Sequence, residues 1–280
     1  WDDKLTIEIN GEAPACESIR IEPTSSSVAT IYLCGNSTVV DQENEPWASW
    51  GQMLPLFFGT DAAVANYAES GESANTSIKA NRLKKALSQM KEGDYLFVEF
   101  GHNDQKQTGP GKGAYYSFAY SIKQYIDEAR AKGAHPVLVT PTRRRHFDTD
   151  HRTILDTHGD FPKAVREIAA RENVPLIDLQ ELTKALYEAF GEDESKKAFV
   201  HYPAGTFRGQ TNELADNTHF NTFGAYEVAK CVIEGIRKAI PELTPYIKEG
   251  PVFNPAHPDN PAEFHWNLSP FSEIEKPDGN

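Results

Sequence analysis

Short apolar runs alternate with amphipathic stretches over most of this chain. Five runs have the length and the β-branched or aromatic content of buried strands: residues 28–33, 62–67, 95–100, 136–140 and 175–179. Between them, apolar residues recur at spacings of three and four, which is typical of helices with one buried face. In residues 225–236 apolar positions fill one face, and Lys230, Glu234 and Arg237 belong to the other. The pattern predicts an α/β fold, with a parallel sheet of about five strands covered by helices on both sides.

The two ends of the chain have a different pattern. Residues 5–9 and 19–21 alternate apolar and polar side chains as half-buried strands do. We interpret residues 1–27 as an N-terminal extension, the tail of an upstream domain, and the absence of an initiator Met favours removal of a preceding segment. Residues 250–280 contain six prolines and four aromatic side chains, so we expect an irregular extension that packs on the body. The predicted central domain spans residues 28–249.

Charge and composition exclude several classes of function. The chain has 28 Lys and Arg against 41 Asp and Glu, a net charge of −13, whereas binding to nucleic acid or to an anionic membrane needs a basic surface. No apolar stretch approaches the ~20 residues of a membrane-spanning helix. The nine histidines form no metal-binding motif, the three cysteines form no CxxC pair, and nucleotide-binding glycine motifs are absent. We therefore expect no nucleic-acid partner, no membrane partner, no metal and no cofactor.

Polar residues cluster directly after three of the predicted strands and before the last predicted helix. The clusters are residues 35–38, 70–73, 101–104 and 216–219. In open α/β sheets, ligands bind beyond the carboxyl ends of the strands, where the strand order reverses. A strand order of 2-1-3 would therefore bring the first three clusters together at one edge of the sheet.

The side chains in these clusters suit acyl transfer. A serine nucleophile needs a base such as histidine, a carboxylate that orients the base, and N–H donors for the oxyanion. The chain contains Ser37 at a strand end, Asp216 three residues before His219, and Gly71 and Asn103 in the other clusters. Each of these residues also has a structural interpretation. Ser37 and the Asp216–His219 pair could cap helices, and Gly71 and Asn103 could be turn residues.

The four clusters resemble the four blocks of SGNH/GDSL hydrolases in order and approximate spacing, over about residues 28–239. Residues 97–105 and 216–221 are most similar to rhamnogalacturonan acetylesterases, and so are residues 136–141 with the three arginines that follow them. The resemblance implies a three-layer α/β/α, flavodoxin-like fold and a serine esterase site without a metal.

The resemblance also implies a role for each candidate residue. Ser37 would be the nucleophile, His219 the base and Asp216 the partner that orients the base. The backbone amides of Ser37 and Gly71 and the side chain of Asn103 would form the oxyanion hole.

The sequence also gives structural expectations for four positions near these clusters. The family has Asp before the serine, and this chain has Asn36, which keeps a turn hydrogen bond but loses the charge. Asp104 is interpreted as a structural cap. Trp47 and Trp50 are three residues apart and are expected on one face of a helix.

Arg143, Arg144 and Arg145 form a basic cluster after the fourth predicted strand. Because an arginine fork matches a carboxylate, these residues and His102 are candidate substrate-binding groups for a uronate-containing glycan. The alternative is a solvated loop or pairing with neighbouring acids.

We interpret the chain as a serine carbohydrate esterase that removes acetyl groups from a plant cell-wall polysaccharide, with rhamnogalacturonan as the leading substrate. Two alternatives stay open: an acetylxylan or general short-chain esterase, and a non-catalytic glycan-binding module on an esterase scaffold. An acetylated polysaccharide substrate predicts a secreted or periplasmic protein, and we expect a monomer.

Overall fold

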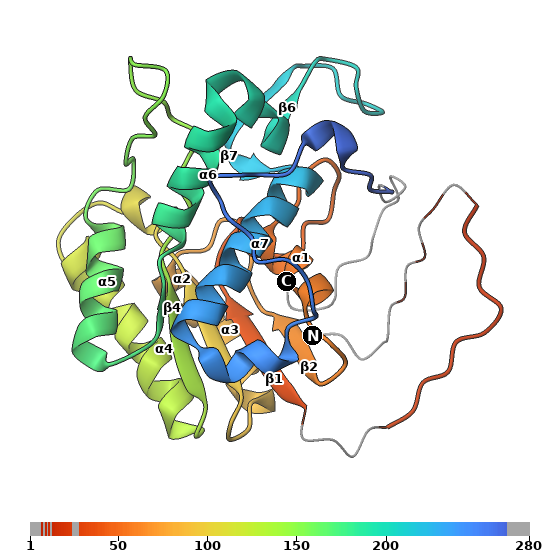
Figure 1. Cartoon of the computed structure of the whole chain (residues 1–280). Helices are drawn as coiled ribbons and strands as arrows, with labels where there is room; N and C mark the ends of the chain where they lie inside the picture. Colours follow the sequence, from red (N-terminus) through yellow and green to blue (C-terminus); the bar gives the residue numbers. More distant parts are fainter. Residues whose placement is uncertain (1–6, 8, 10, 12, 24–27, 268–280) are drawn as a thin grey trace.

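A five-stranded parallel sheet forms the centre of the molecule (Figure 1). The computed structural model describes residues 7, 9, 11, 13–23 and 28–267. The strands are β1 (Ala29–Cys34), β2 (Ala62–Asn66), β3 (Tyr95–Glu99), β4 (His135–Val139) and β5 (Leu176–Ile177). They lie in the order β2-β1-β3-β4-β5, and every neighbouring pair is parallel. The predicted 2-1-3 order is confirmed, and all five predicted strands are present, although β5 has only two residues.

Helices cover both faces of the sheet, as the α/β/α prediction requires (Figure 1). One layer consists of α2 (Ala74–Lys79), α3 (Arg82–Gln89), α4 (Ala119–Ala131) and α5 (Phe161–Glu172). The other consists of α1 (Trp50–Met53), α6 (Leu179–Glu194) and α7 (Thr222–Ala239). The alternation of side chains along β1 separates the two cores. Ile31 and Leu33 pack on the α7 side, and Tyr32 and Cys34 on the other.

Short helical segments complete the connections. They are η1 (Leu54–Phe57), η2 (Asp104–Lys106), the π-helical η3 (Ala114–Phe118), η4 (Ser195–Ala198), η5 (Pro241–Tyr246) and η6 (Pro261–Glu263). Among the described residues, no helix is both long enough and apolar enough to span a membrane.

Helix α7 is almost completely buried, and two glycines allow its close approach to the body. A Cβ atom at Gly224 would lie 1.8 Å from the carbonyl oxygen of Ala198. A Cβ at Gly235 would lie 2.4 Å from Ile177 in β5. Contacts this short would force the helix away from the sheet, so both positions need glycine.

An antiparallel hairpin outside the central sheet was not predicted. It pairs β6 (Phe199–Tyr202) with β7 (Leu214–Phe220). Residues 215–219 are Ala-Asp-Asn-Thr-His, so β7 lacks the apolar run by which a strand is recognised. The hairpin matters for function because β7 carries Asp216 and His219.

The strand predicted at residues 19–21, near the N-terminus, is wrong. Residues 19–21 form no strand, and Ile19 and Ile21 are 53% and 66% exposed. Most of residues 5–9 lies outside the described residues. At the other end, residues 250–267 lie along α7: Phe253 and Phe264 pack on the core, and Lys230 binds Asp259 at 2.7 Å.

Candidate active site

Ser37 sits in a tight turn directly after β1. The turn is closed by Asn36, whose Oδ1 accepts hydrogen bonds from the backbone N and the hydroxyl of Thr38 at 3.1 Å. Gly35 is required here, because a Cβ would lie 2.6 Å from Val39 and 3.0 Å from the carbonyl oxygen of Glu99. On the far side, Gln42 Nε2 donates to the carbonyl oxygen of Ser37 at 2.7 Å. The sequence around the serine therefore builds a rigid turn that presents its hydroxyl.

Asp216 and His219 come from β7, where the strand is interrupted by a bulge. Val200 pairs with Asp216 while the adjacent Phe199 pairs with Phe220, so the residues between them are looped out of the ladder. Asp216 Oδ1 accepts the backbone N–H groups of Thr218 and His219 and fixes this loop. The bulge brings together two side chains three positions apart, which a regular strand would point to opposite faces.

The three side chains form a continuous hydrogen-bonded chain. Ser37 Oγ lies 2.8 Å from His219 Nε2, and His219 Nδ1 lies 2.6 Å from Asp216 Oδ2. The carboxylate holds the proton on Nδ1, which leaves the Nε2 lone pair for the serine proton. Helix capping does not explain this pair, since the cap of α7 is Asn221, which accepts from Gly224 N at 3.0 Å.

The carboxyl of Asp216 stays ionised in this setting. Burial acts to raise its pKa, but the hydrogen bonds from the side chain and backbone of His219 and from the backbone of Thr218 outweigh burial and lower the pKa to about 2. A permanently charged Asp216 can stabilise an imidazolium that forms on His219.

The predicted oxyanion donors lie around the same pocket. Ser37, Gly71, Asn103 and His219 all line a cavity of about 500 Å³, together with residues such as Trp47. Gly71 has a φ of 82°, a conformation that side chains with a Cβ rarely adopt. The strand order brings Ser37, Gly71 and Asn103 together, and the β6–β7 hairpin adds His219.

Asp104 is buried and ties two loops of the site together, in line with the structural role expected for it. Its Oδ1 accepts the backbone N–H of Ala74 at 2.9 Å, and its Oδ2 accepts that of Gly101 at 3.0 Å. Burial raises its pKa to about 6, against the effect of these hydrogen bonds.

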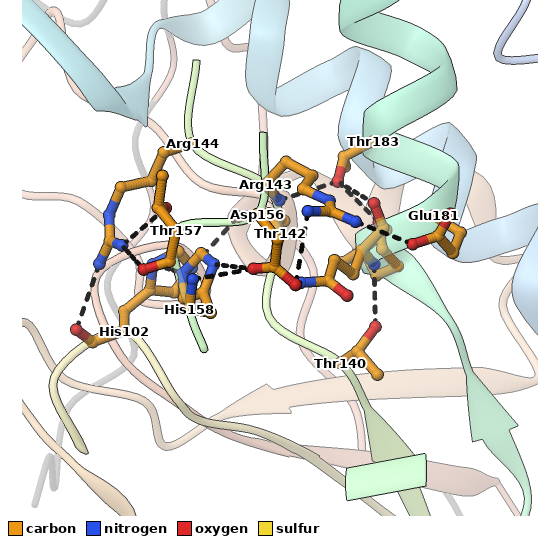
Figure 2. Close-up of polar contacts among 12 residues, drawn as sticks. His102, Thr140, Thr142, Arg143, Arg144, Asp156, Thr157, His158, Glu181 and Thr183 are labelled. Atoms are coloured by element: carbon orange, nitrogen blue, oxygen red, sulfur yellow. Dashed lines mark hydrogen bonds and ion pairs between the residues drawn. The ribbon is translucent and has the colours of Figure 1, made fainter. Parts of the chain in front are cut away.

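The structure does not bring the basic cluster to the pocket, which corrects the expectation that it binds substrate. Arg143 and Arg145 are 7% exposed. Arg143 pairs with Glu181 at 3.0 Å, as Figure 2 shows. Arg145 donates to Asn217 Oδ1 at 2.9 Å and so braces the loop that carries His219. Guanidinium groups committed to internal partners are not available to a substrate carboxylate.

The half-buried Arg144 and the buried His102 belong to the same hydrogen-bonded network (Figure 2). Arg144 donates to Thr157 Oγ1 at 3.0 Å and to the carbonyl oxygen of His102 at 3.3 Å. The His102 ring contacts His158 at 3.0 Å and Thr142 at 3.2 Å, and it is 3% exposed. The predicted substrate-binding role of His102 is therefore replaced by support of the loop that carries Asn103.

Two tryptophans are placed differently from the expectation, and one glutamate of the site was missed. Trp47 and Trp50 do not share a helix face, because α1 begins only at Trp50. Trp50 is buried, and its Nε1 donates to Glu99 Oε2 at 2.6 Å. Glu99 also accepts from Thr38 Oγ1 at 3.0 Å. A buried carboxyl therefore lies directly beneath the turn of residues 35–38, called the nucleophile turn after the role expected of Ser37. Its signal in the sequence is a single acidic residue within an apolar strand.

The chain is similar to several known proteins. Residues 33–225 match the GDSL-like lipase/acylhydrolase family. The chain is 42% identical over 210 residues to the rhamnogalacturonan acetylesterase RhgT of Bacillus subtilis, covering 74% of this chain and 89% of the relative. It is 36% identical over 225 residues to the probable rhamnogalacturonan acetylesterase YesY of the same organism, covering 78% and 98%. The crystal structure of B. subtilis YxiM is similar with a TM-score of 0.65 and 26% identity, over 76% of this chain and 57% of that one.

Proposed function

Because this chain belongs to the GDSL-like lipase/acylhydrolase family, whose members include rhamnogalacturonan acetylesterases similar to it, we propose that its pocket removes acetyl groups from rhamnogalacturonan. The observation that carries the proposal is the hydrogen-bonded chain from Ser37 through His219 to Asp216 at the wall of an open pocket. The chain is thus a carboxylic ester hydrolase, and the acetylated pectic glycan is its proposed substrate.

In the first half of the reaction, Ser37 Oγ attacks the acetyl carbonyl carbon while His219 Nε2 takes the serine proton. The negative charge that develops on the carbonyl oxygen accepts hydrogen bonds from the amides of Ser37 and Gly71 and from Asn103 Nδ2. When the tetrahedral intermediate collapses, the bond between the acyl carbon and the sugar oxygen breaks, and the imidazolium gives its proton to that oxygen. The sugar leaves, and the acetyl group stays on the serine.

In the second half, His219 takes a proton from water, and the resulting hydroxide attacks the acetyl-serine. The same donors hold the second oxyanion, and the proton then passes from His219 to Ser37 Oγ. Acetate leaves, and the site returns to its starting state.

The shape and lining of the pocket support a carbohydrate substrate. The pocket is open to solvent and lined by groups that can bind sugar hydroxyls, such as Asp41, Gln42 and Asn44, while Trp47 offers an apolar ring. A cell-wall polysaccharide lies outside the cytoplasm, so the proposal includes a secreted or periplasmic location and a role in pectin breakdown.

Asn36, in place of the Asp of the family pattern, is compatible with this proposal. Its Oδ1 makes both hydrogen bonds that close the nucleophile turn, and neither needs a charge. We therefore expect an active enzyme rather than a non-catalytic glycan-binding module.

The test is acetate release from acetylated rhamnogalacturonan and acetylated xylan, measured side by side. We expect release from the pectic substrate, abolished by Ser37→Ala and unchanged by Ser88→Ala, a control serine on α3. Equal release from xylan would favour the broader esterase. No release from either substrate by the folded protein would contradict the proposal and favour the binding module.

A further inference from the structure

The side-chain amide of Asn103 is held at both ends. Its Oδ1 accepts a hydrogen bond from Lys106 Nζ at 2.8 Å, and its Nδ2 donates to the carbonyl oxygen of Glu72 at 2.9 Å. An amide nitrogen carries two hydrogens, so one N–H is still available to a ligand. The two contacts orient the amide, and with it the remaining N–H.

The contact with Lys106 follows from the local fold. Residues 104–106 form the 3-10 turn η2, which Asn103 begins. In a 3-10 helix, side chains three positions apart lie above one another, so Lys106 lies over Asn103. Lys106 is exposed at its own position. Among the described residues that line the pocket, it is the one Lys or Arg side chain.

The contact with Glu72 joins the two loops of the predicted oxyanion hole. Glu72 directly follows Gly71, so the bond from Asn103 fixes the distance between the Gly71 amide and the Asn103 amide. Both groups line the pocket beside Ser37. Donors fixed before the reaction stabilise a developing oxyanion without a cost for their reorganisation.

From this geometry we infer that Lys106 is a positioning residue of the oxyanion hole. Its ammonium orients the Asn103 amide and draws electron density from the amide oxygen, which makes the remaining N–H a stronger donor. Charge-assisted hydrogen bonds are about twice as strong as neutral ones. The inference rests on the proposed function, since it concerns the charge that forms during ester hydrolysis.

The first experiment measures kcat and KM of Lys106→Met on 4-nitrophenyl acetate and on acetylated rhamnogalacturonan. We expect kcat to fall by about tenfold on both substrates, with KM within about twofold of wild type, because the lost interaction strengthens only in the transition state. Lys106→Arg should restore most of the loss. Lys84→Met, which removes an exposed charge on α3, should match wild type.

The second experiment tests whether Lys106 acts through Asn103. Asn103→Ala alone should lower kcat by about 10²–10³. If Lys106 works through the amide, adding Lys106→Met to that variant should change kcat by less than about twofold. A persistent tenfold effect in the double variant would overturn the inference.

The inference would also fail if Lys106→Met matched wild type, or if only KM on the polysaccharide rose, which would make the lysine a contact for a substrate carboxylate. Failure of the proposed function looks different. In that case wild type itself would release no acetate from rhamnogalacturonan, while the comparison on 4-nitrophenyl acetate would still be informative.

Discussion

Two carboxylate–histidine pairs near Ser37 differ in burial and in charge. Asp216 and His219 are 2.6 Å apart, and their side chains are 30% and 29% exposed. Glu99 and His102 are 3.6 Å apart, and their side chains are 0% and 3% exposed. Both pairs are three residues apart in the sequence, so spacing does not distinguish them.

Burial and hydrogen bonding decide the charge of each pair. Three N–H groups hold Asp216 ionised and lower its pKa to about 2 despite burial. At Glu99 burial prevails over the hydrogen bonds from Trp50 and Thr38 and raises the pKa to about 7. Burial and the nearby His158 lower the pKa of His102 well below its ordinary value. The half-buried pair Asp216–His219 has the charge that the proposed proton transfer needs, whereas the fully buried pair Glu99–His102 supports the turn that carries Ser37.

The largest effect on activity is expected when the charge is removed from the Asp216–His219 pair. Asp216→Asn should lower kcat by about 10⁴, because the amide would donate to His219 Nδ1 and move the ring proton to Nε2, facing Ser37. The measurement is kcat on 4-nitrophenyl acetate, with the fold checked by circular dichroism. A loss of less than about tenfold would mean that Asp216 does not set the tautomer.

The buried pair should respond in stability rather than in chemistry. Glu99→Ala would leave a cavity and an unpaired Trp50 N–H, so we expect a loss of about 4 kcal/mol in the free energy of unfolding. Urea denaturation measures it. Glu128→Ala, which removes an exposed carboxylate on α4, is the control and should change stability by less than about 0.5 kcal/mol. If the two variants were equally stable, Glu99 would not support the nucleophile turn.

The smallest expected effect is on the pH dependence of stability, and it depends on the charge of Glu99 rather than on its shape. Between its ordinary value of 4.5 and about 7, the folded protein keeps a proton on Glu99 that the unfolded chain releases, so its contribution to stability falls as the pH rises. His102 and His158 act in the opposite direction below pH 6.5, because only the unfolded chain binds protons there.

The difference between wild type and Glu99→Gln isolates the carboxyl. Relative to this variant, wild type should lose up to about 3 kcal/mol of stability from pH 4.5 to 7. Urea denaturation across this range measures the difference. A difference that did not vary with pH would show that folding does not raise the pKa of Glu99.

Most of the sheet, and the residues of the candidate site, could be predicted from the sequence. The five strand runs and the residues 225–236 are defined by apolar spacing, which is a local property. Three of the four polar clusters follow these strands, so the meeting of those three at one edge could be inferred from the strand order alone. The short hairpin escaped this reasoning because β7 is polar and its bulge is defined only by pairing with β6.

The sequence by itself determined the α/β pattern and the candidacy of Ser37, Asp216 and His219, since residue type and spacing limit which side chains can perform acyl transfer. Only the tertiary structure decided which polar groups face the pocket. Arg143 and Arg145 are turned inward to partners on other elements, whereas Lys106 stands at the pocket beside Asn103. The role of a charged side chain depends on its burial and on neighbours distant in the chain, and neither is encoded in a local pattern.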